Sequence, residues 1–250
     1  MNHIPEESEA REESSSPAES AFRGTDSLPI NAPASYSVGK IGRAADNVIE
    51  WVARHWLALF NTVWGIYVGA PFLAATLMYL GFVAPASVIY RIYSFFCHQL
   101  PDHSYFLFGP TFAPTRETLL GAGMPNTSNI FIERAFIGNA EIGWKVALCQ
   151  RDVAIYGAVF LTGILFAIFR ERIRDGISWQ WLILFAVPMA IDGVTQMIGW
   201  RESNWWLRTV TGALFGIGAV LWAYPFIDTA MRELLIEEEK RRNREPGDRG

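Results

Sequence analysis

The feature that most constrains this chain is a set of four long apolar segments within its 250 residues. They lie at residues 56–84, 153–169, 179–200 and 207–227. An α-helix of roughly 20 apolar residues crosses the ~30 Å hydrocarbon core of a bilayer. The sequence therefore predicts an all-α integral membrane protein built as a bundle of four transmembrane helices.

Two hydrophilic tails flank the apolar middle. Residues 1–45 are rich in Glu, Ser and Pro, so we expect a disordered acidic N-terminal tail. Residues 231–250 alternate Glu with Lys and Arg, and we expect this charged tail to continue the last span as a solvated helix. The membrane domain is then residues 46–230. The net charge of −4 is small and argues against a nucleic-acid partner.

Basic residues are unevenly distributed at the ends of the spans. Eleven flank the ends on the side of the two termini, and five flank the opposite ends. Because basic flanks stay in the cytoplasm, we expect a multi-pass cell-membrane protein with both termini cytoplasmic. The connection over residues 85–152 then lies outside the cell. Residues 87–96 predict a short interfacial helix, and the remainder predicts a long extracytoplasmic loop.

Within that connection, a second short helix is predicted over residues 128–137. Ser128 or Asn129 would cap it, and Glu133 and Arg134 would lie on its solvated face. The segment either covers the membrane surface as a lid or forms an exposed loop.

Pairs of small residues predict where the spans approach each other closely. Gly65 precedes Gly69 by four residues in the first span, and Gly212 precedes Gly216 in the last. Glycines at this spacing let a second helix approach the backbone, so we expect both pairs to lie in helix contacts.

Asp192 is the most informative single residue. It lies eight residues before Trp200, about 12 Å below the outer end of the third span at the rise of an α-helix. A carboxylate at that depth costs about 2.5–3.5 kcal/mol unless a partner or a wet cavity offsets the cost. Asp192 therefore forms a structural salt bridge with Arg201 or Arg208, serves binding or catalysis, or is an acid without a role that snorkels to the interface.

Other polar groups are predicted at the same outer level. The candidates for ligand binding are Gln99, Cys149, Arg151, Asp152, Asp192, Gln196, Arg201, Asn204 and Arg208. Such a set suits a small ligand, an ion or a lipid headgroup. Arg151 and Asp152 alternatively form a local ion pair at the start of the second span, where an acid is favourable.

Cys97 and Cys149 are the two cysteines of the chain, and both fall on the predicted outer side. A disulfide between them would close a loop of about 50 residues and stabilise the fold by roughly 4 kcal/mol. Metal ligation by Cys97, His98, His103 and Cys149 is the second interpretation, because these thiols and imidazoles suit zinc. Free thiols are the third. The sequence does not favour the metal over the disulfide.

Three classes of function fit these residues. The first is a binding protein or carrier subunit for an unidentified small molecule or ion. An internal inverted repeat, expected of a carrier, is not visible in four spans, so a carrier would have to be a homo-oligomer. The second is a membrane-surface enzyme in which Cys97, His98 and Asp192 supply the thiol, acid–base and orienting groups. The third is a structural or assembly protein whose polar residues only fix helix packing. The lipid bilayer is an expected partner in all three cases.

The ordered motifs resemble those of one known family. They are Phe-Cys-His-Gln-Leu-Pro at residues 96–101, Cys-Gln-Arg-Asp at 149–152, Asp-Gly-x-x-Gln at 192–196, and the Arg, Asn and Arg of 201, 204 and 208. Over roughly residues 85–225 this pattern is similar to DUF2085, a family of small prokaryotic membrane proteins. In many members the second motif is similar to Cys-x-Arg-Cys, and this chain has Asp152 in place of the last cysteine. The resemblance implies a membrane location and groups these residues, and it implies no particular activity.

Overall fold

The computed structural model of the chain describes residues 40–244, and the predicted acidic tail up to residue 39 lies outside that range. Seven α-helices, one 3₁₀ turn and three strands occur within the described residues. Of the described residues, 45–244 fall in one compact unit.

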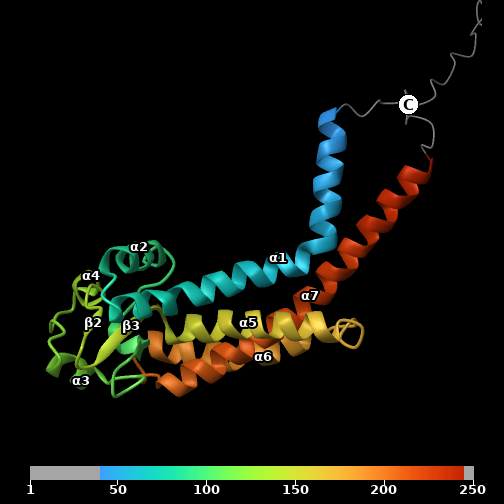
Figure 1. Cartoon of the computed structure of the whole chain (residues 1–250). Helices are drawn as coiled ribbons and strands as arrows, with labels where there is room; N and C mark the ends of the chain where they lie inside the picture. The colour runs from blue at the N-terminus through green and yellow to red at the C-terminus, as the bar shows by residue number, and fades with distance from the viewer. Residues whose placement is uncertain (1–39, 245–250) are drawn as a thin grey trace, which may run out of the picture. The chain divides into compact units, whose positions relative to one another are not determined.

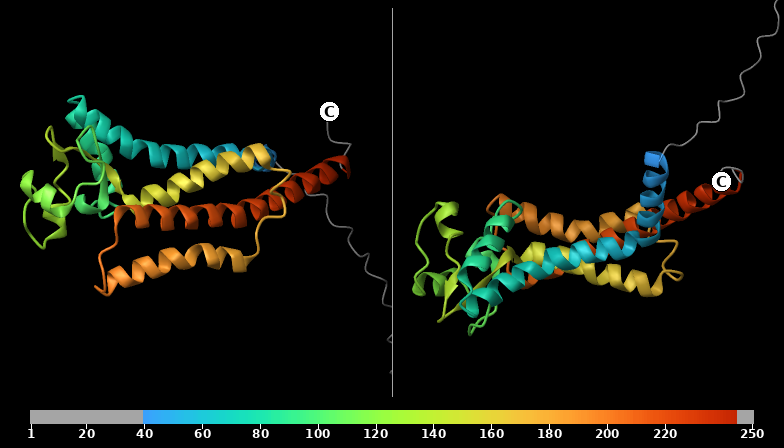
Figure 2. Two further views of the ribbon diagram at one scale, coloured as in Figure 1. Left: turned by 90° about the horizontal axis from the view of Figure 1, so that it is seen from below. Right: turned by 45° about the horizontal axis from the view of Figure 1, so that its top comes forward.

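Four long helices lie side by side as a bundle (Figures 1 and 2). They are α1 (Lys40–Tyr79), α5 (Gln150–Phe169), α6 (Trp179–Met197) and α7 (Trp205–Arg244). The centre of the bundle is the contact between α5 and α7, and α6 packs against α7 at one edge. α7 is continuous to Arg244, so the charged tail does extend the last apolar segment as a helix.

Among the described residues, three helices are long and apolar enough to cross a membrane, namely α1 from Ala44, α5 and α7. These correspond to the first, second and fourth predicted spans. The third predicted span is a helix, α6, but it is not among the three. The first span ends at Tyr79 rather than residue 84, because Gly81 turns the chain with a positive φ of 82° before the next helix.

The glycines of α7 lie where α5 approaches most closely. A Cβ added at Gly216 would lie 2.4 Å from the Ile155 carbonyl oxygen, and one at Gly212 would lie 3.0 Å from the Arg151 carbonyl oxygen. This confirms the predicted contact in the last span. In α1 the prediction is right for Gly65, which contacts Phe160, but wrong for Gly69, around which a Cβ would find open space.

The connection between α1 and α5 forms a folded headpiece, which we define as residues 80–149. Its elements are α2 (Val83–Tyr93), η1 (Pro101–His103), β1 (Ser104–Leu107), α3 (Arg116–Gly121), α4 (Ile130–Glu133), β2 (Gly138–Asn139) and β3 (Gly143–Cys149). The strands make an antiparallel sheet in the order β1-β3-β2. The all-α prediction with a long loop is therefore wrong for this segment.

The sheet escaped prediction because its central strand merges with a span in the sequence. Six of the seven residues of β3 are buried, and its last residue, Cys149, is also the N-cap of α5. A short apolar run that passes directly into a longer one carries no periodicity that separates strand from helix. The direct junction places the end of β3 at the mouth of the bundle.

The predicted helix over residues 128–137 is shortened to α4. Asn129 caps it, as expected, because its side chain accepts a hydrogen bond from the Phe131 N–H at 2.9 Å. Glu133 is buried against Arg116, so the prediction of a solvated face is wrong for this residue. The short helix predicted over residues 87–96 is confirmed as α2, which begins at Val83, ahead of Pro85, and its position at the membrane interface stays a prediction.

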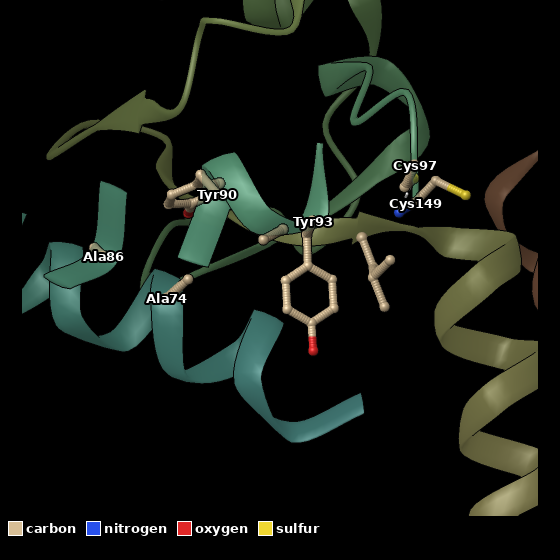
Figure 3. Packing of buried hydrophobic residues seen from close by; sticks show 8 residues of the cluster. Ala74, Ala86, Tyr90, Tyr93, Cys97 and Cys149 are labelled. Carbon is tan, nitrogen blue, oxygen red and sulfur yellow. Dashed lines mark hydrogen bonds between the residues drawn. The ribbon is translucent and has the colours of Figure 1, made fainter. Parts of the chain in front are cut away.

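Two apolar clusters join these parts. In the bundle, Trp56, Phe166 and Tyr224 bring α1, α5 and α7 together. At the junction with the headpiece, Ala74 of α1 packs with Tyr90 and Tyr93 of α2 and with the last residues of β3, as Figure 3 shows. This second cluster fixes the position of the two cysteines.

Candidate functional site

Cys97 lies in a tight turn that follows α2. Its backbone N–H donates to the Tyr93 carbonyl at 3.0 Å, and Gln99 then adopts a positive φ of 52°. A residue with a side chain rarely takes this conformation, which is typical of functional turns. The Gln99 side chain is buried and donates to the Tyr90 carbonyl at 3.0 Å, which holds the turn against α2.

The turn directs two backbone N–H groups at the sulfur of Cys97. Gln99 N lies 3.5 Å and Cys149 N lies 3.3 Å from the Cys97 Sγ. Both cysteines are buried and free, and Figure 3 shows their side chains side by side at the edge of the cluster. The predicted disulfide is therefore not formed in this structure, although the predicted proximity of the two residues is present.

His98 completes a compact group with the two thiols. The ligand atoms of Cys97, His98 and Cys149 all lie within 4.8 Å of one another. The Leu100 N–H donates to His98 Nδ1 at 3.2 Å and orients the imidazole. Burial, together with the nearby His103, lowers the pKa of His98. The hydrogen bond between Cys149 and Cys97, together with burial, raises the pKa of the Cys149 thiol.

His103 lies beside this group but is engaged elsewhere. Its ring is 5.8 Å from that of His98, its Nδ1 bonds to Asp102 Oδ1 at 2.8 Å, and its Nε2 lies 2.9 Å from the Gln196 Nε2. Burial alone would raise the pKa of Asp102, but the hydrogen bond and charge of His103 and the charge of Arg116 outweigh it and lower that pKa. Both nitrogens of His103 therefore have partners without a metal.

Asp192 is held between two arginines, an arrangement we call the Asp192 clasp. Arg151 Nη2 donates to Oδ2 at 2.6 Å, and Arg201 Nη2 donates to Oδ1 at 2.8 Å. The side chain of Asp192 is only 1% exposed. The predicted bridge to Arg201 is present. The alternative prediction of a bridge from Asp192 to Arg208 is wrong, because Arg208 bonds to Gln150 instead. The predicted local pair of Arg151 with Asp152 is also wrong, because Arg151 bonds to Asp192 of α6.

Arg208 belongs to a neighbouring set of hydrogen bonds. Its Nη1 donates to Gln150 Oε1 at 3.1 Å and to the Asp102 carbonyl at 3.5 Å, and Gln150 donates to the Ser104 carbonyl at 3.2 Å. These contacts join α7 to α5, η1 and β1. Asn204 is exposed, and its side chain has no hydrogen bond recorded among residues 40–244.

The sequence interpretation missed Lys145 as a member of this region. Lys145 lies on β3, is 0% exposed, and donates from Nζ to the carbonyls of Gln99 at 2.8 Å and Arg134 at 2.7 Å. Burial lowers the pKa of Lys145 to about 7. A neutral amine has two N–H donors, and these two carbonyls accept both. The sequence did contain a signal that could have identified this residue, namely a lysine directly before the apolar run at residues 146–149.

A second clasp, at the opposite end of α5, was also missed. Asp228 of α7 is 1% exposed and accepts hydrogen bonds from Arg170 and from Arg232, the latter at 2.9 Å. Arg232 also donates to Glu171 at 3.1 Å. The signal in the sequence was Asp228, an acid directly after the last apolar segment and one helical turn before Arg232.

Comparison with known proteins places these residues in a family. The family model described as "Predicted membrane protein (DUF2085)" matches residues 133–222. An uncharacterised protein of Methanocaldococcus jannaschii is 29% identical over 160 residues, which cover 62% of this chain and 81% of that protein. An uncharacterised protein of Methanothermobacter thermautotrophicus is 37% identical over 76 residues, 30% of this chain and 68% of that protein.

No solved structure matches the chain. The matched residues 133–222 include Cys149, Arg151, Asp192 and Arg201, whereas Asp228 lies beyond them. With its three apolar helices of membrane-spanning length and these matches, the chain is a membrane protein that belongs to the DUF2085 family.

Proposed function

We propose that this protein binds a soft divalent metal ion, with zinc the best fit, through Cys97, His98 and Cys149 at the junction of headpiece and bundle. The observation that carries the proposal is the convergence of three ligand atoms within 4.8 Å of one another. A site with two thiolates and one imidazole binds zinc in preference to magnesium or calcium, which favour oxygen ligands. The proposal thus selects the ion among the classes of ligand considered from the sequence.

The backbone around the cysteines supports a thiolate form in the presence of a cation. The two N–H groups directed at Cys97 Sγ, from Gln99 and Cys149, would stabilise negative charge on that sulfur. Cys149 caps the N-terminus of α5, where the helix dipole also favours an anion. The pKa of Cys149 is raised when the two thiols contact each other without an ion. A bound divalent ion would lower this pKa, because its charge stabilises the thiolate.

The imidazole must adjust when a metal binds. Because the Leu100 N–H donates to Nδ1, the neutral ring carries its proton on Nε2. Ligation through Nε2 requires the proton to move to Nδ1, and ligation through Nδ1 uses the lone pair of that atom. In both cases the Leu100 N–H loses its acceptor and must turn away. Either change is local to the turn that holds Cys97.

A fourth ligand position would be taken by water, or by Asp152 after a change of its side-chain rotamer, because its carboxylate is not among the three ligand atoms that converge here. Asp152 is in the first turn of α5, three residues after Cys149. By the family resemblance, it stands where many members have a cysteine. Three protein ligands with a fourth exchangeable position are typical of catalytic rather than structural zinc sites. The remaining predicted site residues, held by one another in the Asp192 clasp and around Arg208, serve in this proposal to fix the helices.

We further infer that α6 is a fourth span. Its 19 residues extend about 28 Å at the helical rise, close to the thickness of the hydrocarbon core. The clasp of Asp192 by two arginines offsets much of the cost of an acid at that depth. With four spans, both termini lie on the side with the excess of basic residues, the cytoplasm, and the metal site faces outward.

Metal content of the purified protein tests the proposed site. The full chain, extracted in mild detergent after growth with zinc, should contain about one zinc per chain by mass spectrometry. Cys97→Ser, Cys149→Ser and His98→Ala should each lose most of it, and His55→Ala, which alters a histidine of α1 far along the chain, should retain it. Cobalt substitution should give a thiolate-to-metal absorption band in the wild type and in His55→Ala, and lose most of it in the three ligand variants.

The same preparation distinguishes the alternatives for the cysteines. Thiol labelling that requires prior reduction would establish the disulfide and overturn the metal site. Equal metal content in the wild type and in all three ligand variants would also overturn it. Ready labelling after chelation, and protection from labelling by added zinc, is the expected outcome.

A further inference from the structure

A cavity of about 410 Å³ lies at the end of the bundle opposite the cysteines. Its ionisable lining residues are Arg54 and His55 of α1, Arg170 at the end of α5, and Arg232 of α7. Ala53, Met231 and Leu235 make up the rest of the lining. Three guanidinium groups with no acidic side chain in the lining form a site suited to an anion.

The acids that pair with these arginines sit around the cavity rather than in its lining. Arg54 is paired with Glu50, Arg170 with Asp228, and Arg232 with both Asp228 and Glu171. Asp228 is almost fully buried, and its oxygens are taken up by the two arginines. The charge of the lining is thus largely balanced, so a ligand would be held by directed N–H groups more than by net charge.

Donors remain for such a ligand. Each guanidinium has five N–H groups, and the recorded pairs occupy one or two nitrogens of each arginine. The Nε of Arg170 is buried and has no hydrogen-bond partner among the described residues. Because this Nε is itself buried, a ligand in the cavity would be held by the other N–H groups of the three arginines.

The position of the cavity points to a lipid phosphate. Arg170 directly follows α5, a helix of 20 residues, so the cavity lies at one surface of the hydrocarbon layer. On the bundle side of the cavity, α1 and α7 continue into their apolar segments, at residues 56 and 227, and we call this surface the apolar wall. Acyl chains can lie against that wall while the phosphate meets the arginines, as in basic pockets between spans.

We propose that this cavity binds the phosphate group of an anionic membrane lipid through Arg54, Arg170 and Arg232. A free phosphate ion has the same acceptor oxygens but no contact with the apolar wall. The site is independent of the proposed metal site, because it lies at the other end of α5 and uses none of the same residues.

The test compares one cavity arginine with one arginine outside it. Arg54→Gln removes a lining guanidinium without touching the Asp228 clasp, and Glu50 keeps Arg242 as a partner. Arg172→Gln removes the same charge from an exposed residue near the same end of α5. Full-length protein in detergent is titrated with phosphatidylglycerol, with phosphatidylcholine and with inorganic phosphate, and binding is followed by native mass spectrometry and by the unfolding midpoint.

The wild type should bind phosphatidylglycerol in preference to phosphatidylcholine, because the two lipids share a phosphate but the choline ammonium would face the lining guanidinium groups. Arg54→Gln should bind phosphatidylglycerol about tenfold more weakly, the loss expected for one charge-assisted hydrogen bond. Arg172→Gln should match the wild type. Equal loss in both variants would show general surface attraction and overturn the proposal. Inorganic phosphate that stabilises as well as the lipid would overturn the lipid source. If Arg54→Gln unfolds, Arg54→Lys, which keeps the charge but loses the fork, should still weaken binding, and unchanged binding would sink the idea.

Discussion

The two ends of the bundle use the same motif in different settings. At the headpiece end, Asp192 is held by Arg151 and Arg201, and at the other end Asp228 is held by Arg170 and Arg232. Both carboxylates are 1% exposed. The helices that carry them differ. α6 buries one residue, Asp192 itself, whereas α7 buries nine, most of them in contact with other helices.

This difference separates polar from apolar attachment. α7 is fixed by close backbone contact with α5, and the Asp228 clasp adds to a helix that is already packed. α6 lies at the edge of the bundle, where its Phe185 packs closely against Gly218 of α7. Its one buried residue is a carboxylate held by the arginines of two neighbouring segments. In a bilayer, where apolar surface gains little by leaving lipid, such polar contacts decide which helix is held where.

Replacement of Asp192 should have the largest effect. Asp192→Ala leaves two partly buried guanidinium groups without their carboxylate, and removal of one partner of a buried pair costs about 3–5 kcal/mol of unfolding free energy. Asp228→Ala should cost less, about 1–3 kcal/mol, because Arg232 keeps Glu171. Equilibrium unfolding in mixed micelles measures both. Hydrogen exchange should rise along α6 only in Asp192→Ala, and an equal rise in both variants would contradict the comparison.

Glycine substitutions test the apolar side of the same comparison. Gly216→Ala places a Cβ 2.4 Å from the Ile155 carbonyl oxygen, so α5 and α7 must separate, at a cost of about 1–3 kcal/mol. Gly69→Ala, in α1, meets no atom within 4 Å and should be neutral or slightly stabilising. Unfolding of the two variants under one condition gives the difference. A cost for Gly69→Ala as large as that for Gly216→Ala would refute the packing described here.

The headpiece end should respond to pH through Lys145. Its pKa is lowered from 10.5 to about 7, so between these values the unfolded chain binds more protons than the folded one, and stability rises with pH. The slope is at most about 1.4 kcal/mol per pH unit. The raised pKa of Cys149 acts in the opposite sense above its ordinary value of 9.0, so pH 7 to 8.5 is the informative window.

The pH experiment compares unfolding of the wild type with Lys145→Met and with Lys240→Met, whose lysine is exposed on α7. The rise between pH 7 and 8.5 should vanish in Lys145→Met and persist in Lys240→Met. A rise of the same size in all three proteins would place the titrating group elsewhere.

The smallest expected effect on stability is that of Asp152→Cys, which makes the second motif resemble the commoner family pattern. If zinc binds at Cys97, His98 and Cys149, a third thiolate should tighten binding by at least about tenfold. Chelator competition measures this, with Asp152→Ser as the control for loss of the carboxylate. Unchanged zinc retention in Asp152→Cys would mean that residue 152 does not reach the metal.

Several parts of the fold could be derived from the sequence because they depend on local properties. Apolar length is one, and it located α1, α5 and α7. The Gly212–Gly216 pair and the Asn129 cap are others, since each acts within one or two helical turns. Asp192 was recognisable because an acid inside an apolar segment needs a partner wherever the helix lies. For the same reason Arg201, only nine residues away, was a correct choice of partner.

Contacts between distant residues were decided only by the tertiary structure. Arg151 is 41 residues from Asp192, and no local pattern distinguishes it from Arg208 as a partner. The sheet that buries Lys145 and brings Cys149 beside Cys97 closes a loop across 52 residues. Such closure depends on the sum of many weak apolar contacts around β3, and a pattern of residue types does not contain that sum. The sequence by itself therefore determined that the chain is a membrane protein and that Asp192 and the two cysteines need partners. The tertiary packing determined which groups those partners are.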